Sequence, residues 1–511
     1  MRNSMKQLAS RQGGRATTST EPMQLPTGGM NEIAAPGARA ATEAAYLLNF
    51  LPYDGDLRVR EGYTVVKSRT APVSILGYVL SGGEGALAVD GDGWILSLQD
   101  DGTVNGVGLN GGLSSTKGLV GAMNSDRLCI VDGVNAGMKL YSGTGSIVSA
   151  AFTGDYAGEI WSGVTAHQRR LFFWKENSLD FWYLDNPDSI QGEIVKFELS
   201  FLGRLSGTIA TIASWSTDAG QGTNDLLAVV TTTGDVAIYE GTDPGDPLSW
   251  RLNGVYQTSQ VAGSDTWVNV GGDLRLATKM GVVSFAELLN AGELAATVTS
   301  TPARTIAPRF RAAADVTGKN RYWQSFVAPD ARGVWFNLPT ATGSGQVVFS
   351  TETSRCFWFN LPAVEFAKSR KTLWFTTVDG KICRYGGNSD GGSYIVAEWH
   401  SDWLDSRRKT VEAVRMSFEC PTGVFLDIAV NADLRPASAL QETMSDTDVD
   451  YTNETEISWK VKSLDGIADE ELPVEGIGDR LQIRARVENR YFEVIKWKAT
   501  DVRRRSLARS R

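Results

Sequence analysis

Residues 228–250 read AVVTTTGDVAIYEGTDPGDPLSW. Two runs in which apolar residues alternate flank a Thr-Gly-Asp turn, and a period of two is typical of β-strands. A short turn that contains glycine joins such strands into an antiparallel hairpin. After the second run the chain passes into Gly, Asp and Pro, which end strands and form loops. The stretch therefore predicts a β-hairpin that leaves through an acidic loop.

The same pattern recurs along the chain. The hairpin-like units are found at 86–98, 127–143, 170–185, 226–241, 274–288, 333–360 and 372–387. Their turn centres lie 36 to 63 residues apart, at Gly91, Val134, Asn177, Thr233, Met280, Gly343 and Asp379. Four-stranded blades of β-propellers repeat every ~40–50 residues, so each hairpin would supply two strands of one blade. We expect an all-β fold with a β-propeller of about six to seven blades over residues 63–393.

The residues that flank the repeats differ in character. Residues 1–62 predict an extended N-terminal arm, flexible over 1–20, with a short helix near 42–48. Residues 394–502 contain longer strands with more charge and fewer glycine turns, which predicts a smaller antiparallel β-unit. Residues 503–511 predict a basic, flexible tail.

Composition narrows the classes of function. The chain has 511 residues, with 50 basic and 59 acidic side chains and a net charge of -9. This balance argues against a wide surface that grips nucleic acid, although it allows a surface past which DNA slides. Four cysteines lie far apart, which predicts buried thiols of a reducing compartment and neither disulfides nor a zinc site. We expect no membrane-spanning segment, because no apolar run approaches ~18 residues.

Candidate catalytic and metal sites are few. Only two histidines occur, and His167 is interpreted as a loop or interface residue because no nucleophile motif accompanies it. We expect no catalytic, cofactor or metal site. The carboxylates of the first hairpin are interpreted as turn residues and not as calcium ligands, because their spacing fails the EF-hand pattern. These residues are Asp90, Asp92, Asp100 and Asp101.

Residues 214–222, SWSTDAGQG, nearly match the Asp-box of sialidase-like propellers, S-x-D-x-G-x-x-W. Thr223 stands where the motif has its tryptophan. In that motif the tryptophan packs into the blade and the aspartate caps a turn, so we interpret the segment as a polar turn between blades.

Two segments resemble a known family. Within residues 22–66, the words Gly28-Gly29-Met30-Asn31, Asn49-Phe50-Leu51-Pro52 and Arg60-Glu61-Gly62-Tyr63 follow in the family's order. Residues 199–290 carry its central words, which here are Trp215, Asp218, Gly220, Gly234, Asp235, Val236, Tyr239, Gly241, Thr242, Asp243, Pro244, Trp250, Gly254 and Gly271 to Leu274. These segments, about a third of the chain, resemble the β-propeller tail hub or nozzle protein of short-tailed double-stranded DNA bacteriophages, the packaged-DNA stabilisation protein. One departure is Glu32-Ile33, where the family usually has Arg-Asp.

The resemblance implies a structural virion protein of the tail, without catalysis, that is assembled in the host cytoplasm. It implies a homohexameric ring below the portal and its adaptor protein, with tail fibres, tailspikes or a needle attached. The ring would close the DNA channel before infection and conduct double-stranded DNA during ejection, without sequence-specific binding. Long connections near 186–225 and 290–330 are candidates for closing the lumen. The alternative class is a propeller-type glycan-binding or sialidase-like protein, for which repeated complete Asp-boxes are missing.

The C-terminal arginines are the most pronounced charge run. They are Arg503, Arg504, Arg505, Arg509 and Arg511. They could contact DNA phosphates or an acidic groove of a neighbouring subunit, and they could equally form a solvated tail.

Overall fold

The computed structural model describes residues 18–109, 112–216, 225–291, 301–328, 332–405, 409–432, 456–461, 463–464, 466–476 and 480–506. Internal contacts divide the chain into two compact units. One unit comprises Glu61–Gly392, and the other combines the chain up to Arg60 with the chain from Ser393 onward.

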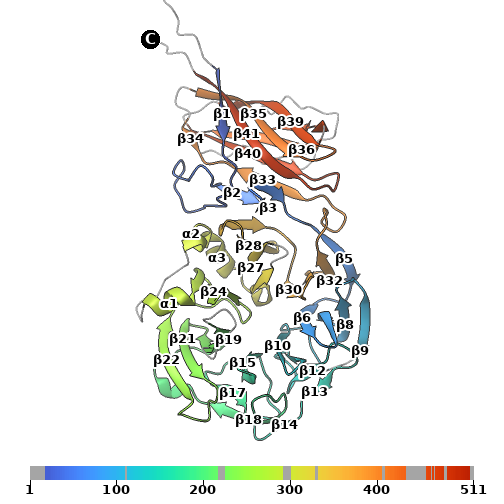
Figure 1. Cartoon of the computed structure of the whole chain (residues 1–511), viewed down its shortest axis with the longest axis vertical. Helices are drawn as coiled ribbons and strands as arrows, with labels where there is room; N and C mark the ends of the chain where they lie inside the picture. The colour runs from blue at the N-terminus through green and yellow to red at the C-terminus, as the bar shows by residue number, and fades with distance from the viewer. Residues whose placement is uncertain are drawn as a thin grey trace, which may run out of the picture. The chain divides into compact units, whose positions relative to one another are not determined.

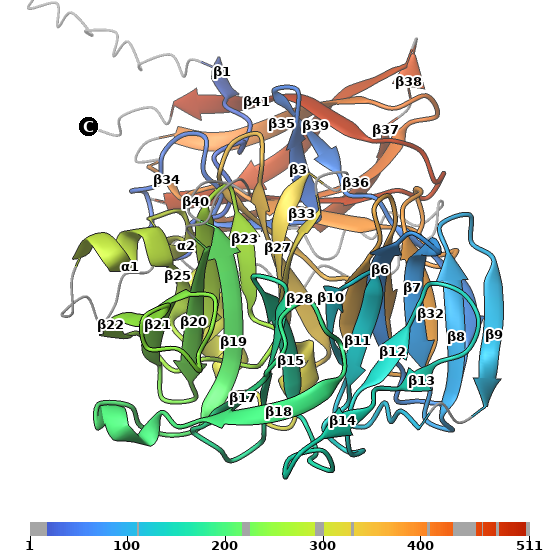
Figure 2. The same cartoon turned by 60° about the horizontal axis from the view of Figure 1, so that its bottom comes forward.

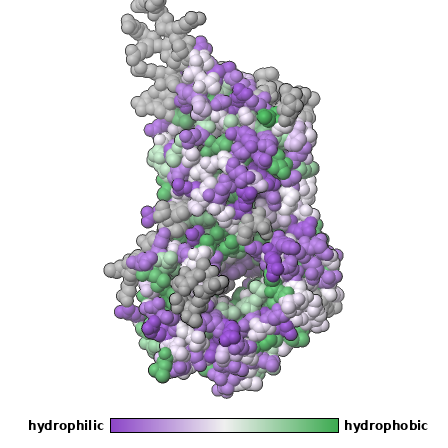
Figure 3. Space-filling model, viewed as in Figure 1, coloured by the Kyte–Doolittle hydropathy of each residue, from purple (hydrophilic) through white to green (hydrophobic). Residues whose placement is uncertain are grey.

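The unit Glu61–Gly392 is a seven-bladed β-propeller (Figure 1). Blade one consists of β6(Ser74–Leu80), β7(Gly83–Val89), β8(Trp94–Gln99) and β9(Val104–Leu109). Blade two consists of β10(Val120–Asn124), β11(Arg127–Val131), β12(Lys139–Tyr141) and β13(Val148–Ser149). Blade three consists of β15(Gly163–His167), β16(Arg170–Trp174), β17(Phe181–Leu184) and β18(Gly192–Phe197), and β14(Phe152–Thr153) pairs with β18. Blades four and five are β19(Ile209–Ser216), β20(Asp225–Thr231), β21(Asp235–Gly241) and β22(Trp250–Gln257); and β23(Trp267–Val270), β24(Asp273–Thr278) and β25(Gly281–Ser284). Blade six has β26(Gln324–Ala328), β27(Gly333–Pro339), β28(Ser344–Ser350) and β29(Cys356–Phe359), and blade seven has β30(Glu365–Lys368), β31(Leu373–Thr376), β32(Lys381–Tyr385) and β5(Tyr63–Ser68). Figure 3 shows this unit hollowed at its centre.

All seven predicted hairpins are confirmed as neighbouring, paired strands of one blade. Their alternating apolar residues give each blade two apolar faces, and buried clusters join consecutive blades. Trp374 of blade seven, for example, packs with Ala86 and Leu98 of blade one. The burial of both faces explains why the strands contain so many aromatic and branched residues.

The ring of blades is closed by a pairing between distant parts of the chain. Strand β5, the first of the unit, pairs with β32 of the last blade, from Tyr63↔Tyr385 to Lys381↔Ser68. Just before β5, the Gly62 N–H donates to the carbonyl oxygen of Gly387 at 2.8 Å. A Cβ at Gly62 would lie 2.0 Å from the carbonyl oxygen of Ser389, so only glycine fits at this closure.

Helices replace a fourth strand in blade five. They are α1(Phe285–Ala291), α2(Thr301–Arg304) and α3(Ala307–Ala314), followed by the 3-10 turn η2(Asn320–Tyr322). The helices contact β25, whose four residues are all buried, and Phe310 of α3 is fully buried. The described residues 301–322, part of the long connection expected near 290–330, therefore contain short helices that pack on β25. Similarly, the described part of 186–225 includes β18, β19 and the 3-10 turn η1(Ser200–Leu202).

The second unit consists of two antiparallel sheets. The first contains β3(Phe50–Tyr53), β4(Asp56–Val59), β41(Lys496–Ser506), β35(Lys409–Glu419), β39(Ile467–Gly476) and β38(Ser463–Leu464), with β1(Thr18–Met23) beside β41. The second contains β2(Tyr46–Leu48), β33(Val396–His400), β40(Arg480–Glu488), β36(Val424–Ala432) and β37(Glu456–Val461), with β34(Leu404–Asp405) beside β40. Trp497 of the first sheet packs edge-on against Trp399 of the second, with ring centroids 5.0 Å apart. The two sheets therefore share one core.

Several expectations about the chain ends were wrong. The predicted helix near 42–48 is replaced by β2, in which Tyr46 pairs with His400 and Leu48 with Glu398. Tertiary pairing and the burial of Leu47 outweigh the local helix preference of this segment. Of the ends expected to be flexible, residues 18–20 and 503–505 pair with each other instead, in a ladder that runs from Thr18↔Arg505 to Met23↔Thr500. Residues 1–17 and 507–511 lie outside the described residues.

Candidate functional site

The hairpin with the family-specific words lies in blade four, where its turn is fixed by its own side chains. Gly234 has a φ of 96°, and a Cβ there would lie 2.5 Å from the carbonyl oxygen of Thr258. The Asp235 carboxylate accepts hydrogen bonds from the Ser206 N–H at 2.7 Å and the Ser206 hydroxyl at 2.6 Å. Gly234 and Asp235 therefore attach this turn to the segment that enters the same blade.

In other blades, too, an aspartate carboxylate at a turn accepts backbone hydrogen bonds. Asp132 in blade two accepts the N–H of Ser114 at 2.7 Å. Asp90 in blade one accepts the N–H of Trp94 at 2.8 Å and pairs with the Arg69 guanidinium at 2.6 Å. These contacts confirm that Asp90 is a turn residue. Among the described residues, no group of three or more His, Cys, Asp and Glu side chains is placed to hold a metal ion.

The exit of the blade-four hairpin is anchored to blade three by His167, the last residue of β15. His167 is 1% exposed, and its Nε2 lies 3.2 Å from the carbonyl oxygen of Gly241. Because a carbonyl oxygen can only accept, Nε2 carries the proton and Nδ1 accepts from the Ser214 hydroxyl at 2.8 Å. Burial lowers the pKa of His167 to about 4, so the imidazole is neutral near pH 7. The contact is that of an interface residue, because so weak a base would activate a serine poorly.

A second anchor from blade three holds the acidic loop. Arg170, in the next strand β16, donates to the carbonyl oxygens of Leu184 at 2.7 Å and Asp185 at 2.5 Å. Its guanidinium also pairs with Asp243 at 3.3 Å, and Asp243 in turn accepts the N–H of Gly245 at 3.0 Å. Arg170 is 3% exposed at its side chain, so this ion pair is largely shielded from solvent on the arginine side.

The aromatic residues of the family words are core residues. Tyr239 stacks on Trp250 with ring centroids 5.2 Å apart, inside the cluster between blades three and four. Burial raises the pKa of the Tyr239 hydroxyl. Trp215 packs edge-on against Phe285 at 5.6 Å, between blades four and five. Pro244 is buried whereas Thr242 is exposed; Asp218 and Gly220 lie outside the described residues.

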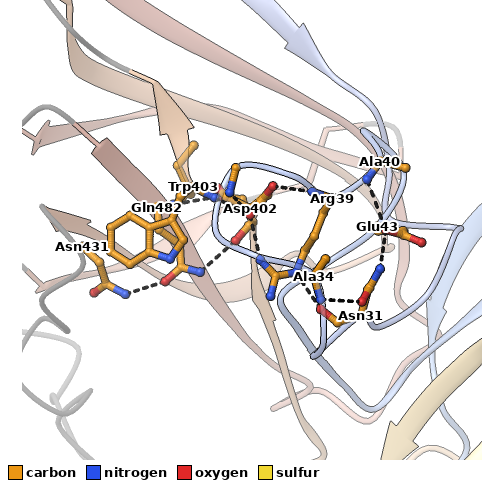
Figure 4. A network of polar contacts seen from close by, with 12 residues as sticks. Asn31, Ala34, Arg39, Ala40, Glu43, Asp402, Trp403, Asn431 and Gln482 are labelled. Carbon is orange, nitrogen blue, oxygen red and sulfur yellow. Dashed lines mark hydrogen bonds and ion pairs between the residues drawn. The ribbon is translucent and has the colours of Figure 1, made fainter. Parts of the chain in front are cut away.

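The N-terminal family motif, residues 28–31, holds a loop of the second unit together by hydrogen bonds (Figure 4). The Gly28 N–H donates to the Thr42 carbonyl oxygen at 2.7 Å, and a Cβ at Gly28 would lie equally close to that oxygen. Gly29 has a φ of 79°, which favours glycine. The side chain of Asn31 donates to Glu43 at 2.8 Å and accepts the Ala34 N–H at 3.1 Å. These contacts fold residues 28–45 back on themselves.

An ion pair fixes this loop to Asp402, in the short connection between β33 and β34 (Figure 4). Arg39 donates through Nε to the Asn31 carbonyl oxygen at 2.6 Å and pairs with Asp402 at 2.8 Å. Burial alone would raise the pKa of Asp402, but hydrogen bonds from the backbone N–H groups of Gly37, Arg39 and Trp403 and from the Arg39 guanidinium outweigh it and lower this pKa. Ile33, at the position where the chain departs from the family word, is 57% exposed.

The described C-terminal arginines form ion pairs within their own sheet. They lie in β41, where Arg503 pairs with Glu471 at 2.6 Å, Arg504 with Glu21 at 3.3 Å and Arg505 with Glu412 at 3.5 Å. The prediction of a flexible tail was therefore wrong for Arg503, Arg504 and Arg505, because strand pairing and these carboxylates order them. Arg509 and Arg511 lie outside the described residues.

The innermost strands of the propeller carry almost no charge. They are β6, β10, β15, β19, β23, β26 and β30. Across these seven fully described strands, the charged residues are Glu365 and Lys368, at the two ends of β30. Glu365 is 5% exposed, pairs with Arg321 at 2.5 Å and accepts the Ser74 hydroxyl at 2.6 Å, which ties blade seven to blade one. These inner strands therefore offer little charge to a phosphate backbone.

The cysteines are buried, as predicted. Burial raises the pKa of Cys129, Cys356 and Cys383 to about 12 and that of Cys420 to about 11. These thiols are therefore weakly reactive near neutral pH.

No protein-family model matches this chain, and no curated protein sequence matches it. Among solved structures, BBS1N in complex with ARL6DN is similar with a TM-score of 0.39 and 11% identity, over 64% of this chain and 98% of that one. The extracellular domain of the putative one-component system BT4673 from B. thetaiotaomicron is similar with a TM-score of 0.41 and 9% identity, over 86% of this chain and 62% of that one. Sqt1 from Saccharomyces cerevisiae is similar with a TM-score of 0.35 and 8% identity, over 66% of this chain and 85% of that one. In the part of the chain that the structure describes, no helix is both long and apolar enough to cross a membrane.

Proposed function

We propose that this chain is a structural, non-catalytic protein of the tail of a short-tailed double-stranded DNA bacteriophage, where it forms the hub or nozzle ring. The observation that carries the proposal is the ordered set of sequence words in residues 22–66 and 199–290. In that role the ring lies below the portal and its adaptor protein, and it carries fibres, spikes or a needle.

The propeller suits a protein that is held against pressurised DNA. A closed ring of blades leaves few free strand edges and resists deformation, because every blade packs between two neighbours. Here the pairing of β5 with β32 closes the ring, so that opening one blade would require breaking a strand ladder. The rigidity supports a load-bearing role.

We propose that DNA passes through a lumen formed between copies and not through the bore of one propeller. The inner strands offer almost no cations to a phosphate backbone, and moving charged phosphates along a neutral, confined wall would cost solvation energy. The net charge of -9 fits a lumen wall that repels DNA weakly throughout, so that DNA would not stall at any point during ejection.

The test is a mass measurement on the purified chain mixed with portal–adaptor complexes. We expect a closed ring of about six copies bound to the complex, since head-to-tail contacts close into rings. A chain that stays monomeric at all concentrations and ignores the portal–adaptor complex would contradict the proposal.

A further inference from the structure

The inner strands of blades five, six, seven and one are linked by polar side chains that stand where these strands begin. Asp265 lies just before β23, and the other three residues are the first of their strands: Gln324 of β26, Glu365 of β30 and Ser74 of β6. A parallel backbone bridge joins Asp265 to Gln324, so the beginnings of neighbouring inner strands lie side by side. Figure 2 shows β6 and β19, two of the inner strands, standing upright on either side of the ring.

Gln324 holds the joint between blades five, six and seven. Its side-chain nitrogen donates to the Asp265 carboxylate at 2.9 Å and to the Phe366 carbonyl oxygen at 3.4 Å, and its side-chain oxygen accepts the Phe366 N–H at 2.5 Å. The Ser325 N–H donates to the Asp265 carbonyl oxygen at 2.9 Å. Both ends of the Gln324 amide are used, so this side chain cannot turn away from Asp265 without losing its bonds to blade seven.

Glu365 continues the connection to blades one and two. Besides the Ser74 hydroxyl, its carboxylate accepts the Ile75 N–H at 3.1 Å, and the Ser74 hydroxyl oxygen accepts the Leu119 N–H at 2.8 Å. The Arg321 guanidinium that pairs with Glu365 also donates to the Val73 carbonyl oxygen at 2.9 Å. Of the two carboxylates in this network, the one with a cation is therefore Glu365.

In the described part of the chain, no cation pairs with the Asp265 carboxylate, whose side-chain partner is the neutral amide of Gln324. The cations of the neighbouring elements are bound elsewhere: Arg321 to Glu365, Arg275 to Asp273 at 3.3 Å, Lys279 to the Gln260 side chain at 3.0 Å and Lys319 to the Thr340 carbonyl oxygen at 2.8 Å. β26 itself has no charged side chain. The charged group that acts on Asp265 is therefore the like charge of Glu365.

These surroundings disfavour the charged form of Asp265. The residue as a whole is exposed, but its carboxyl group is surrounded by the blades. This burial, together with the charge of Glu365, raises the pKa of Asp265 to about 6, against the opposing effect of the Gln324 hydrogen bond. Because the folded protein then holds this proton more tightly than the unfolded chain does, the joint loses stability as the pH rises through about 6.

We propose that Asp265 is a proton-operated latch between the blades: its charged carboxylate loosens the joint of blades five, six and seven, and protonation tightens that joint. The latch acts at the Gln324 amide, which bonds to Asp265 on one side and to the Phe366 backbone on the other. The inference concerns a single folded chain and does not depend on the proposed function.

Hydrogen exchange of the full-length protein tests the latch at the Ser325 and Phe366 amides. Asp265→Asn removes the charge but keeps a side-chain oxygen that accepts from Gln324. At pH 8 we expect these amides to exchange about tenfold more slowly in the variant than in the wild type, the equivalent of one unit of pKa. At pH 5, where the wild-type carboxyl group is mostly protonated, the two proteins should exchange at equal rates.

Asp188→Asn is the matched control. Asp188 is an exposed aspartate of blade three that pairs with Arg169 at 3.1 Å, and its φ of 63° is one that asparagine also adopts. This variant loses the same charge away from the network, so exchange at Ser325 and Phe366 should match the wild type at both pH values.

Three results would overturn the latch. Equal or faster exchange of Asp265→Asn at pH 8 would mean that the charged carboxylate does not loosen the joint. The same ratio of rates at pH 5 and pH 8 would mean that protonation plays no part, and an equal effect of Asp188→Asn would assign the change to net charge alone. As a second measurement, the unfolding midpoint of Asp265→Asn should exceed that of the wild type at pH 8 and equal it at pH 5, and a lower midpoint at pH 8 would refute the proposal.

Discussion

Gly241 has no room for a side chain. Its φ is 131°, and a Cβ would lie 1.9 Å from the carbonyl oxygen of Ser249. We expect Gly241→Ala to lower the free energy of unfolding by about 2 kcal/mol or more, because backbone atoms would have to move. Gly343→Ala is the matched control, since a Cβ there would meet no atom within 4 Å. Thermal unfolding of both variants checks this, and equal midpoints would show that the Gly241 contact is not strained.

His167 makes the stability of the propeller depend on pH. The pKa of His167 is about 4 in the folded protein, whereas the ordinary pKa of histidine is 6.5, so the unfolded chain binds more protons between these values. The contribution of neutral His167 to the free energy of unfolding is complete above pH 6.5 and is lost as the pH falls toward 4. At pH 5 the free energy of unfolding is lower by about 2 kcal/mol for this reason.

We expect His167→Gln to remove this loss, because the amide can still donate to Gly241 and accept from Ser214. The measurement is the difference in unfolding midpoint between pH 7 and pH 5 for wild type and variant, so that carboxylates common to both cancel. An identical pH dependence in the two proteins would show that His167 is not buried as a neutral group.

At the scale of elements, the closing strand β5 should control the integrity of the ring of blades. A Cβ at Gly62 would lie 2.0 Å from a backbone oxygen, so Gly62→Ala should weaken the pairing of β5 with β32 and expose blade seven to proteolysis. Gly106→Ala, in β9, is the control because a Cβ there meets nothing within 4 Å. Limited proteolysis that cleaves both variants at the same rate would argue against this closure.

The end of β41 should be structural. A chain truncated after Val502 loses Arg503, Arg504 and Arg505, which pair with both β1 and β35. It should unfold at a clearly lower temperature than a chain truncated after Ser506. Most of the difference should survive in ~1 M salt, since exposed ion pairs contribute only ~0–1 kcal/mol and the strand ladder supplies the rest. Equal unfolding temperatures would mean that this strand end adds no stability.

The sequence predicted the elements whose partners are close along the chain. All seven hairpins were recognised, because period-two alternation and glycine turns act locally. The strands β1, β2 and β5 were missed, since each is short and its partner lies hundreds of residues away. The helices between 285 and 314 were missed because they form by packing on β25, with little helical periodicity of their own.

The candidate site was predicted only in part. Tyr239, Gly241 and Asp243 stood out as family words, but not the residues that hold them. His167 and Arg170 belong to a different blade, and nothing in the spacing of the sequence pairs that blade with the loop. The one available signal was the HQRRLFF run, in which three ionisable side chains directly precede a strongly apolar stretch.

At the scale of the whole molecule, the two units contribute different properties. The propeller has a closed ring of seven blades with a nearly uncharged inner wall. The second unit carries strands in which Lys496 and Lys498 pair with Glu419, at 2.9 Å and 3.0 Å, and Arg503 with Glu471, so its basic strand is neutralised within the sheet.

The proposed function requires that several copies of this chain surround a DNA passage. The most direct measurement is cryo-electron microscopy of the chain assembled with portal–adaptor complexes. We predict a closed ring whose axial lumen lies between copies and is wide enough for duplex DNA, with each propeller bore off the axis. Particles without a ring, or a DNA path that runs through the bore of a single propeller, would contradict it.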